Sequence, residues 1–376
     1  MDTSGQPEDR PLRHEPSVCD LLESVIDALR FCPLEWPRSV LGKLRSMKPA
    51  PFSEYELFWR LALYLVDVLV PSLPTEAPSW VPRPFSWLFF HSAGELKPGE
   101  GDPPTTDVGG ERWFFINGIL TNEDVARMNA AYLVELFHRP ISILYNATDG
   151  PVIDLLKCAS EKLGARDADV DMAFHPLLEA IADPRKKRVV LIAHSQGTLI
   201  TAVVLRLIKE VYSHTVSGQR GVLSDDDRDA IRRKAKAAGL TVHTDRLEPV
   251  DEDNLAMLEV YCFANCATDM RYIHDGLPRI ESFGNEHDLV ARLGMLAPDA
   301  RRENIHIAGP CFKHEGAWGH LLNAHYLIDI DREQRQRKPP PDASAPYVLI
   351  EGTAPPGTVP LLFSYLNGAG AIPDAP

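Results

Sequence analysis

Residues 188–201 read RVVLIAHSQGTLIT, which is an apolar run, a short polar break and a second apolar run. The run 188–193 has the length and the β-branched content of a buried strand, and the pattern from Gly197 to about Val211 predicts a helix. Ser195 stands where the two elements would join. Because sites in open parallel sheets form at the carboxyl ends of strands, Ser195 is the first candidate functional residue.

The same alternation continues on both sides of this stretch. We expect further strands at 112–117, 140–145, 258–264, 279–283 and 304–308. We expect helices at 123–138, 151–163 and 171–182. Strands that alternate with helices form a parallel sheet that is covered by helices on both faces. The sequence therefore predicts an α/β fold.

Composition divides the chain into regions. They are a flexible tail (1–20), a helical, Pro- and aromatic-rich N-terminal extension (21–110), an α/β core (111–336) with a polar insertion (214–257), and a Pro-rich C-terminal tail (337–376). Within the insertion, Ser224 precedes acidic residues, then basic residues, and Gly239 ends the pattern. This order predicts an exposed helix that is capped by Ser224.

Composition and charge argue against several classes of protein. The chain has 376 residues and a hydrophobic content of 44%, which is enough to fill a core. Its net charge of −14, from 53 acidic and 39 basic residues, disfavours nucleic acid and anionic membranes as partners. The apolar helix expected at 55–70 carries Arg60 and Asp67 and is shorter than a membrane span of about 20 residues.

Cysteine usage and the N-terminus favour a cytoplasmic protein. The first residues lack the apolar segment of a secretory signal, and the six cysteines are scattered without a C-x-x-C pair. We therefore expect a reduced chain with no zinc site. The sequence contains no P-loop, no G-x-G-x-x-G and no H-E-x-x-H, so we expect neither a cofactor nor a metal.

The break itself, Ala193-His194-Ser195-Gln196-Gly197, matches the pattern G-x-S-x-G with Ala for the first Gly. Small residues are needed there because the turn is tight and the serine takes a strained conformation. With its preceding strand and following helix, the stretch resembles the nucleophile elbow of the α/β-hydrolase superfamily, in the lipase and esterase branch. His194 would then support the turn by packing. The alternative is a serine in an ordinary loop.

The resemblance implies an acid and then a histidine later in the chain. Residues 284–290, GNEHDLV, resemble the N-x-x-D-x-V loop of the family and give Asp288 as the acid. The alternative role of Asp288 is to cap the helix expected to follow it. Asp269 is the second candidate for the acid, and Glu286 is the third.

The base is expected in the segment 313–326, which contains His314, His320 and His325. His320 follows a glycine-containing loop and opens an apolar helix, which is where the family places its base. His325 would point away from His320 on that helix, so packing is its expected role. His314 stays open, because a loop residue can reach many positions.

The resemblance also implies an oxyanion hole made from backbone N–H groups. One donor would be Gln196, which follows the nucleophile. The other would be Ile119, in the segment 116–121, INGILT, which resembles the H-G-x loop of the family. Asn117 stands where the family usually has His, and Gly118 would let the backbone turn its amide inward.

These residues imply a serine hydrolase that cleaves carboxylic esters, with lipid or acyl esters as substrates, through Ser195, His320 and Asp288. An acyltransferase or thioesterase would use the same residues. A protein of a different class, a hydrolase-fold binding or scaffold protein without catalysis, is the other alternative.

The segment 79–92 is rich in aromatic residues and prolines: Trp80, Phe85, Trp87, Phe89 and Phe90 lie among Pro78, Pro82 and Pro84. Prolines at this spacing prevent a regular helix, so the rings must pack on another surface. One interpretation is a strap that covers the edge of the sheet. The other is a lid or interfacial patch that gives peripheral contact with a membrane or lipid.

Overall fold

The computed structural model describes the following residues: 94–96, 109–118, 123–145, 167–218, 222–298, 302–327, 330 and 347–372. Several expectations therefore lie outside the described residues: the tail 1–20, the helix at 55–70, the aromatic segment 79–92 and the helix at 151–163. None of the helices in the described ranges is long and apolar enough to cross a membrane.

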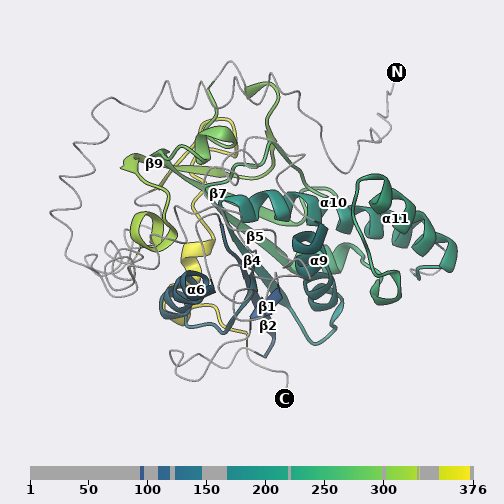
Figure 1. The fold of residues 1–376 in the computed structure, drawn as a ribbon. Coiled ribbons are helices and arrows are strands. Elements are labelled where there is room, and N and C mark those ends of the chain that lie inside the picture. The colour runs from purple at the N-terminus through teal and green to yellow at the C-terminus, as the bar shows by residue number, and fades with distance from the viewer. Residues whose placement is uncertain are drawn as a thin grey trace, which may run out of the picture.

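A sheet of eight strands forms the centre of the described structure (Figure 1). The strand order is β1-β3-β2-β4-β5-β7-β9-β10. Every strand from β3 to β9 in this order runs parallel to its neighbour, and the edge strands β1 and β10 are antiparallel. The bounds are Gly94–Leu96 (β1), Glu111–Ile116 (β2), Ile141–Tyr145 (β3), Arg188–His194 (β4), Leu258–Phe263 (β5), Arg279–His287 (β7), Cys311–Trp318 (β9) and Tyr347–Leu349 (β10).

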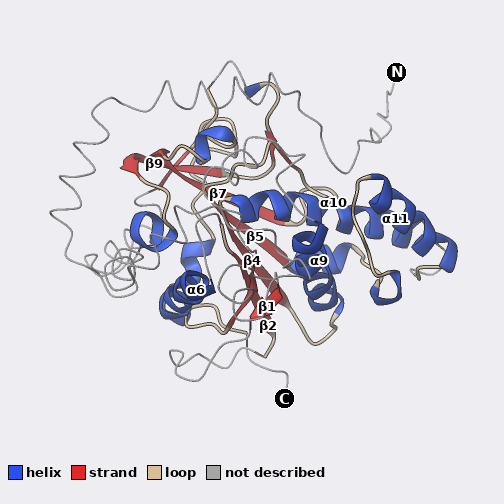
Figure 2. Cartoon of the chain, in the orientation of Figure 1, coloured by secondary structure: helices blue, strands red, loops and turns tan. Residues whose placement is uncertain are grey.

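Helices cover both faces of this sheet, so the predicted α/β class is confirmed (Figure 2). They are α6 (Glu123–Phe137), α9 (Asp167–Ala182) and α10 (Gln196–Ser217). On β2, Phe114 and Ile116 pack with α9 and α10, whereas Trp113 and Phe115 pack with α6. A strand that is buried on both faces needs apolar residues at every position, which explains the continuous apolar runs in the sequence.

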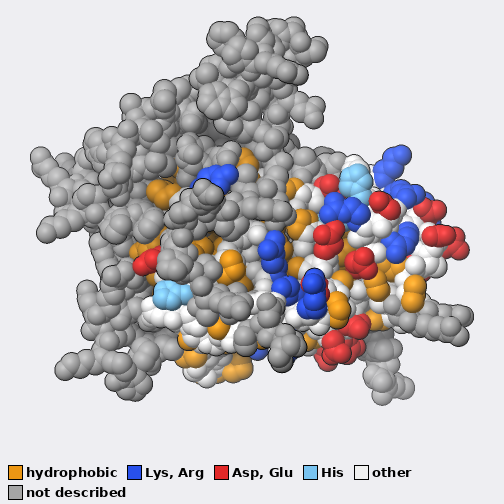
Figure 3. Space-filling view, turned by 90° about the horizontal axis from the view of Figure 1, so that it is seen from below, with side chains coloured by type: hydrophobic (Ala, Val, Ile, Leu, Met, Phe, Trp, Pro, Cys, Tyr) orange, Lys and Arg blue, Asp and Glu red, His pale blue; other side chains and the backbone are white. Residues whose placement is uncertain are grey.

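The predicted insertion helix is present as α11 (Asp225–Ala237), and Ser224 and Asp227 form a reciprocal capping box at its start. Ile231 and Ala235 are buried against the body of the protein. Basic and acidic side chains gather at this end of the molecule (Figure 3). The short helix α12 (Glu252–Met257) follows and leads into β5.

The structure differs from the sequence expectations after β7. The strand expected at 304–308 shrinks to β8 (His306–Ile307), which pairs with β6 (Asp269–Met270) outside the main sheet. The sequence does not predict strand β9, because its residues 313–316, KHEG, are mostly polar, and Glu315 and Gly316 are exposed. Residues 347–372, part of the region expected to be a Pro-rich tail, form β10 and the turn η5 (Leu362–Gly368).

Candidate active site

Ser195 occupies the sharp turn between β4 and α10. Its backbone has φ 56° and ψ −124°, a conformation that is strained for any residue with a Cβ. The Ser195 N–H donates to the carbonyl of Phe263 at the end of β5, 2.9 Å away, and this bond holds the turn against the sheet. The strained turn expected from the sequence is therefore present.

Two glycines explain why this turn tolerates only small residues. A Cβ on Gly197 would lie 2.8 Å from the carbonyl oxygen of Ile116 and 3.0 Å from that of Asn117. A Cβ on Gly118 would lie 2.5 Å from the Cβ of Ser195. The loop after β2 and the start of α10 therefore approach the serine as closely as backbone allows.

His320 and Asp288 complete a chain of hydrogen bonds that begins at Ser195. His320 Nε2 lies 2.8 Å from Ser195 Oγ. On the other side of the ring, His320 Nδ1 lies 2.9 and 3.1 Å from the two carboxylate oxygens of Asp288. Ser195 and Asp288 are buried, and the His320 side chain keeps 19% exposure. The structure thus brings together the serine, base and acid candidates, in the geometry of a proton relay.

Asp288 is charged despite its burial. Burial by itself would raise the pKa of this carboxyl, but the charge and the hydrogen bond of His320 outweigh that effect and lower the pKa. Hydrogen bonds from Tyr326 and from the Val290 N–H act in the same direction. Val290 directly precedes the turn η3 (Ala291–Leu293), and its N–H donates to Asp288. Asp288 therefore caps this turn and also faces His320.

The alternative acids and bases have other partners. Asp269 accepts from Arg271 Nε at 2.6 Å, and Glu286 accepts from the Gly316 N–H at 2.7 Å. His325 Nδ1 accepts from the Leu321 N–H at 2.9 Å, in the packing role expected for it.

His314, the remaining alternative base, lies on β9. Its ring centroid is 5.4 Å from that of Tyr347 on the neighbouring edge strand β10. The structure instead places His320 beside Ser195, and Asp288 on the far side of the His320 ring.

His194 contacts the candidate base His320 and does not itself face Ser195 Oγ. Its Nε2–H donates to the carbonyl of His320 at 2.8 Å, and the two rings stack with centroids 4.8 Å apart. Burial, together with the nearby charge of His320, lowers the pKa of His194 to about 3. The ring is therefore neutral at physiological pH and acts as a fixed hydrogen-bond donor.

The proposed oxyanion hole is described in part. Gln196 is the first residue of α10 and directly follows Ser195, at a helix N-terminus, where negative charge is favoured. Asn117 is fully buried and its side-chain amide donates to the Gly118 carbonyl at 3.3 Å. Ile119 lies outside the described residues, so its role as second donor stays a prediction.

Three further buried residues, which no local sequence pattern singles out, contact the site. Tyr326 donates to Asp288, Asn285 donates to carbonyls of the segment that carries His320, and Cys266 contacts the Ser195 carbonyl. Only their positions in the sequence point to two of them: Asn285 begins the N-x-x-D motif that contains Asp288, and Tyr326 follows His320 within the same segment. Local pattern gives no indication of what a buried hydroxyl contacts.

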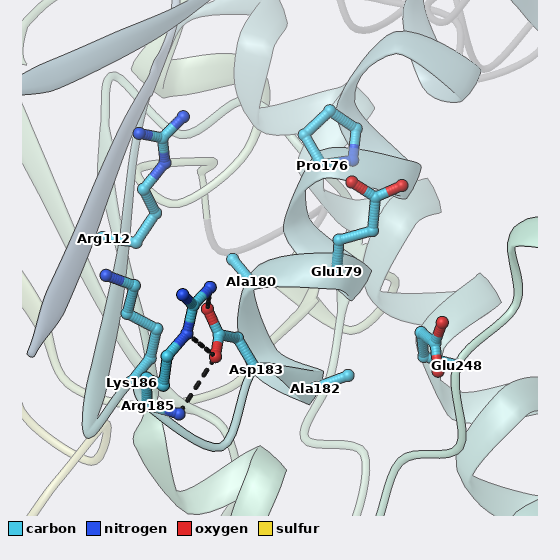
Figure 4. A pocket seen from close by; sticks show the side chains of 9 residues that line it. All are labelled: Arg112, Pro176, Glu179, Ala180, Ala182, Asp183, Arg185, Lys186 and Glu248. Atoms are coloured by element: carbon cyan, nitrogen blue, oxygen red, sulfur yellow. Dashed lines mark hydrogen bonds and ion pairs between the residues drawn. The ribbon is translucent and has the colours of Figure 1, made fainter.

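A pocket of about 620 Å³ lies at the opposite, amino end of the parallel strands (Figure 4). It is bordered by Arg112 near the start of β2, the last turns of α9 and the turn before β4. Asp183 in this pocket accepts two hydrogen bonds from the Arg185 side chain, which are the main reason that its pKa falls to about 2. Because sites in parallel sheets form at the carboxyl ends of strands, this pocket is not the candidate site.

Within the described ranges, no group of three or more His, Cys, Asp or Glu residues could hold a metal ion. The chain matches no protein-family model and no curated protein sequence. The functional conclusion therefore depends on the geometry around Ser195.

Proposed function

We propose that the protein is a serine hydrolase with an α/β-hydrolase fold, and that it cleaves carboxylic esters. The observation that carries this proposal is the continuous chain Ser195–His320–Asp288, with contacts of 2.8 and 2.9 Å, built on a turn of positive φ. The order of the three residues along the chain and the parallel sheet below them support the same class. A binding protein has no need of this relay.

In the first half of the reaction, Ser195 Oγ attacks the acyl carbon of the ester. His320 Nε2 accepts the proton, and Asp288 stabilises the imidazolium that forms. The backbone N–H groups of Gln196 and Ile119 would bind the oxyanion. When the tetrahedral intermediate collapses, the bond to the alcohol oxygen breaks and His320 returns the proton to that oxygen.

In the second half, water attacks the acyl-serine. His320 Nε2 takes a proton from this water, and the carboxylic acid leaves as Ser195 Oγ recovers the proton. An alcohol or thiol in place of water would give acyl transfer through the same residues. Product analysis with competing acceptors distinguishes the two outcomes. Acyl and lipid esters are the substrates to test first, because the aromatic segment 79–92 favours apolar surfaces.

The test is covalent labelling and a serine variant. A fluorophosphonate probe should label Ser195, and Ser195→Ala should abolish labelling and lower turnover of a p-nitrophenyl ester by roughly 10⁴-fold or more. Ser213→Ala, which removes an exposed serine from the same helix α10, should retain both signals. A wild-type protein that the probe does not label would contradict the proposal and favour the scaffold alternative.

A further inference from the structure

The hydroxyl of Tyr326 lies against the acid of the triad. Tyr326 belongs to the short helix η4 (Leu322–Leu327) and is fully buried. Its Oη donates to Asp288 Oδ2 at 2.6 Å and accepts from the Asn285 N–H at 3.2 Å. Both hydrogen-bonding directions of the hydroxyl are therefore used, and its proton points at Asp288.

The same carboxylate oxygen serves the base. Asp288 Oδ2 accepts from His320 Nδ1 at 2.9 Å as well as from Tyr326 Oη. Two donors on one oxygen compete for its negative charge, and a short O–H···O⁻ bond is among the stronger hydrogen bonds in proteins. A change in the Tyr326 bond must therefore alter the bond to His320.

The hydroxyl stays protonated over the working range of the enzyme. Burial, and then the charge of Asp288, raise the pKa of Tyr326 well above its usual value. The other titratable groups next to this cluster are His194 at the end of β4, which is neutral and stacks on His320, and Tyr347 on β10, while His325 on η4 acts on His194.

The segment that carries both His320 and Tyr326 is tied to the end of β7. Asn285 Nδ2 donates to the carbonyl of Gly319 at 3.2 Å and to that of His325 at 2.9 Å. These bonds hold the segment on both sides of His320. Asp288, three residues after Asn285, is thus bound by the base and by Tyr326 from one anchored segment.

We infer that Tyr326 is a positioning residue of the triad. Its hydroxyl holds the Asp288 carboxylate toward His320 and withdraws charge from it, and so limits the basicity of His320. The inference rests on the proposed function for its catalytic meaning, but its effect on His320 is measurable without turnover.

Tyr326→Phe keeps the ring and removes the hydroxyl. The carboxylate charge would then act on His320 alone and stabilise its imidazolium, so the titration midpoint of His320 should rise by roughly 0.5 to 1 pH unit. The midpoint is read by NMR on protein with ¹⁵N-labelled histidine, with the His320 signal assigned by its loss in His320→Gln.

Tyr365→Phe is the matched control. It also removes a buried tyrosine hydroxyl that donates to a carboxylate, that of Glu259 at 2.9 Å, at a site with no part in the triad. The His320 midpoint should be unchanged in this variant. If Tyr326→Phe is folded and His320 titrates as in the wild type, the inference is overturned.

A second measurement covers a Tyr326→Phe protein that fails to fold. Incorporation of 3-fluorotyrosine at position 326 keeps the shape but makes the hydroxyl a stronger donor, so the His320 midpoint should fall instead of rise. An unchanged midpoint would again overturn the inference.

Activity separates this inference from the proposed function. In an active enzyme, the acid limb of the kcat/KM profile should move to higher pH in Tyr326→Phe, and kcat should fall by about 10-fold with little change in KM. A wild type that is not labelled at Ser195, with a His320 midpoint that still moves only in the position-326 variants, would refute the hydrolase and leave the positioning role intact.

Discussion

At the scale of single residues, the site depends on the protonation states of His194 and Asp288 as much as on their distances from His320. His194 donates its Nε2–H to the His320 carbonyl and is neutral because burial opposes its charge. Asp288 is charged because its hydrogen bonds and the charge of His320 outweigh its burial. Ionisable groups with shifted pKa values are typical of catalytic sites, and here both His194 and Asp288 contact His320.

His194 makes the free energy of unfolding depend on pH below about pH 6.5. Its pKa is about 3 in the folded protein against 6.5 for the free side chain, so the unfolded chain binds the proton more tightly. The stabilisation is present above pH 6.5 and is lost as pH falls toward 3. Between pH 7 and pH 5 the loss should be about 2 kcal/mol in the free energy of unfolding.

Urea unfolding at pH 7 and pH 5 measures this loss. His194→Gln can still donate to the His320 carbonyl but cannot take up the proton, so it should lose less stability than the wild type over this interval. His306→Gln, an exposed histidine on β8, should behave as the wild type. Equal losses in the wild type and His194→Gln would show that His194 is not the titrating group.

At the scale of elements, the strand-turn-helix unit β4–α10 depends on close contact between the backbone of α10 and the backbone at the end of β2. Helix α10 starts against the end of β2, and Gly197 is the contact point. This close approach sets the place of Ser195 relative to the loop at Gly118. The geometry of the elbow is therefore a property of two strands and a helix together.

Gly197→Ala should disturb that unit. The added Cβ would meet backbone oxygens that cannot rotate away, so α10 must shift, at a cost of about 1–3 kcal/mol in stability. We expect slower fluorophosphonate labelling of Ser195 because the turn moves with the helix. Val216→Ala, at an exposed position on α10, should change neither the urea midpoint nor the labelling rate. Labelling at the wild-type rate in Gly197→Ala would contradict this account.

At the scale of the whole molecule, the C-terminal segment is held on the sheet by carboxylates on three strands, of which Glu111 and Glu281 are buried. Glu281 accepts from the Leu361 N–H, Glu259 accepts from the Tyr365 hydroxyl, and Glu111 accepts from the Ile372 N–H. Glu111 also forms a fully buried ion pair with Arg139 at 3.0 Å. These hydrogen bonds join the C-terminal segment to strands β2, β5 and β7, which lie far from it in the chain.

Glu281 makes stability depend on pH in the direction opposite to His194. Burial is the main cause that raises its pKa to about 7, from 4.5 for the free side chain, so the folded protein binds this proton more tightly. The stabilisation is complete below pH 4.5 and is lost as pH rises through 7. From pH 5 to pH 8 the loss should be about 2–3 kcal/mol.

Glu281→Gln should remove this part of the pH dependence, since Gln keeps an acceptor for the Leu361 N–H and does not ionise. The measurement is urea unfolding at pH 5 and pH 8, with the exposed Glu303→Gln as control. A wild type and a Glu281→Gln variant with parallel pH profiles would rule out Glu281 as the source.

Local sequence patterns are sufficient to predict several elements of this fold. Buried parallel strands need continuous apolar runs, so β2, β3, β4, β5 and β7 were predictable, as were the capped helix α11 and the turn at Ser195. The candidates Asp288 and His320 followed from their order after the serine in the resembled family. The sequence predicts strand β8 too long and does not predict β1, β9 or β10, because edge strands and polar strands lack that pattern.

Which of the candidate residues contact one another depends on how the whole chain folds. Several contacts join residues that are distant in sequence. Tyr326 donates to Asp288, Asn285 donates to the segment that carries His320, and Glu281 accepts from the C-terminal segment. Nothing in a local pattern distinguishes a buried tyrosine that fills space from one that donates to an acid. That distinction depends on the direction of a single O–H bond, which is set when the chain folds and strand ends come together.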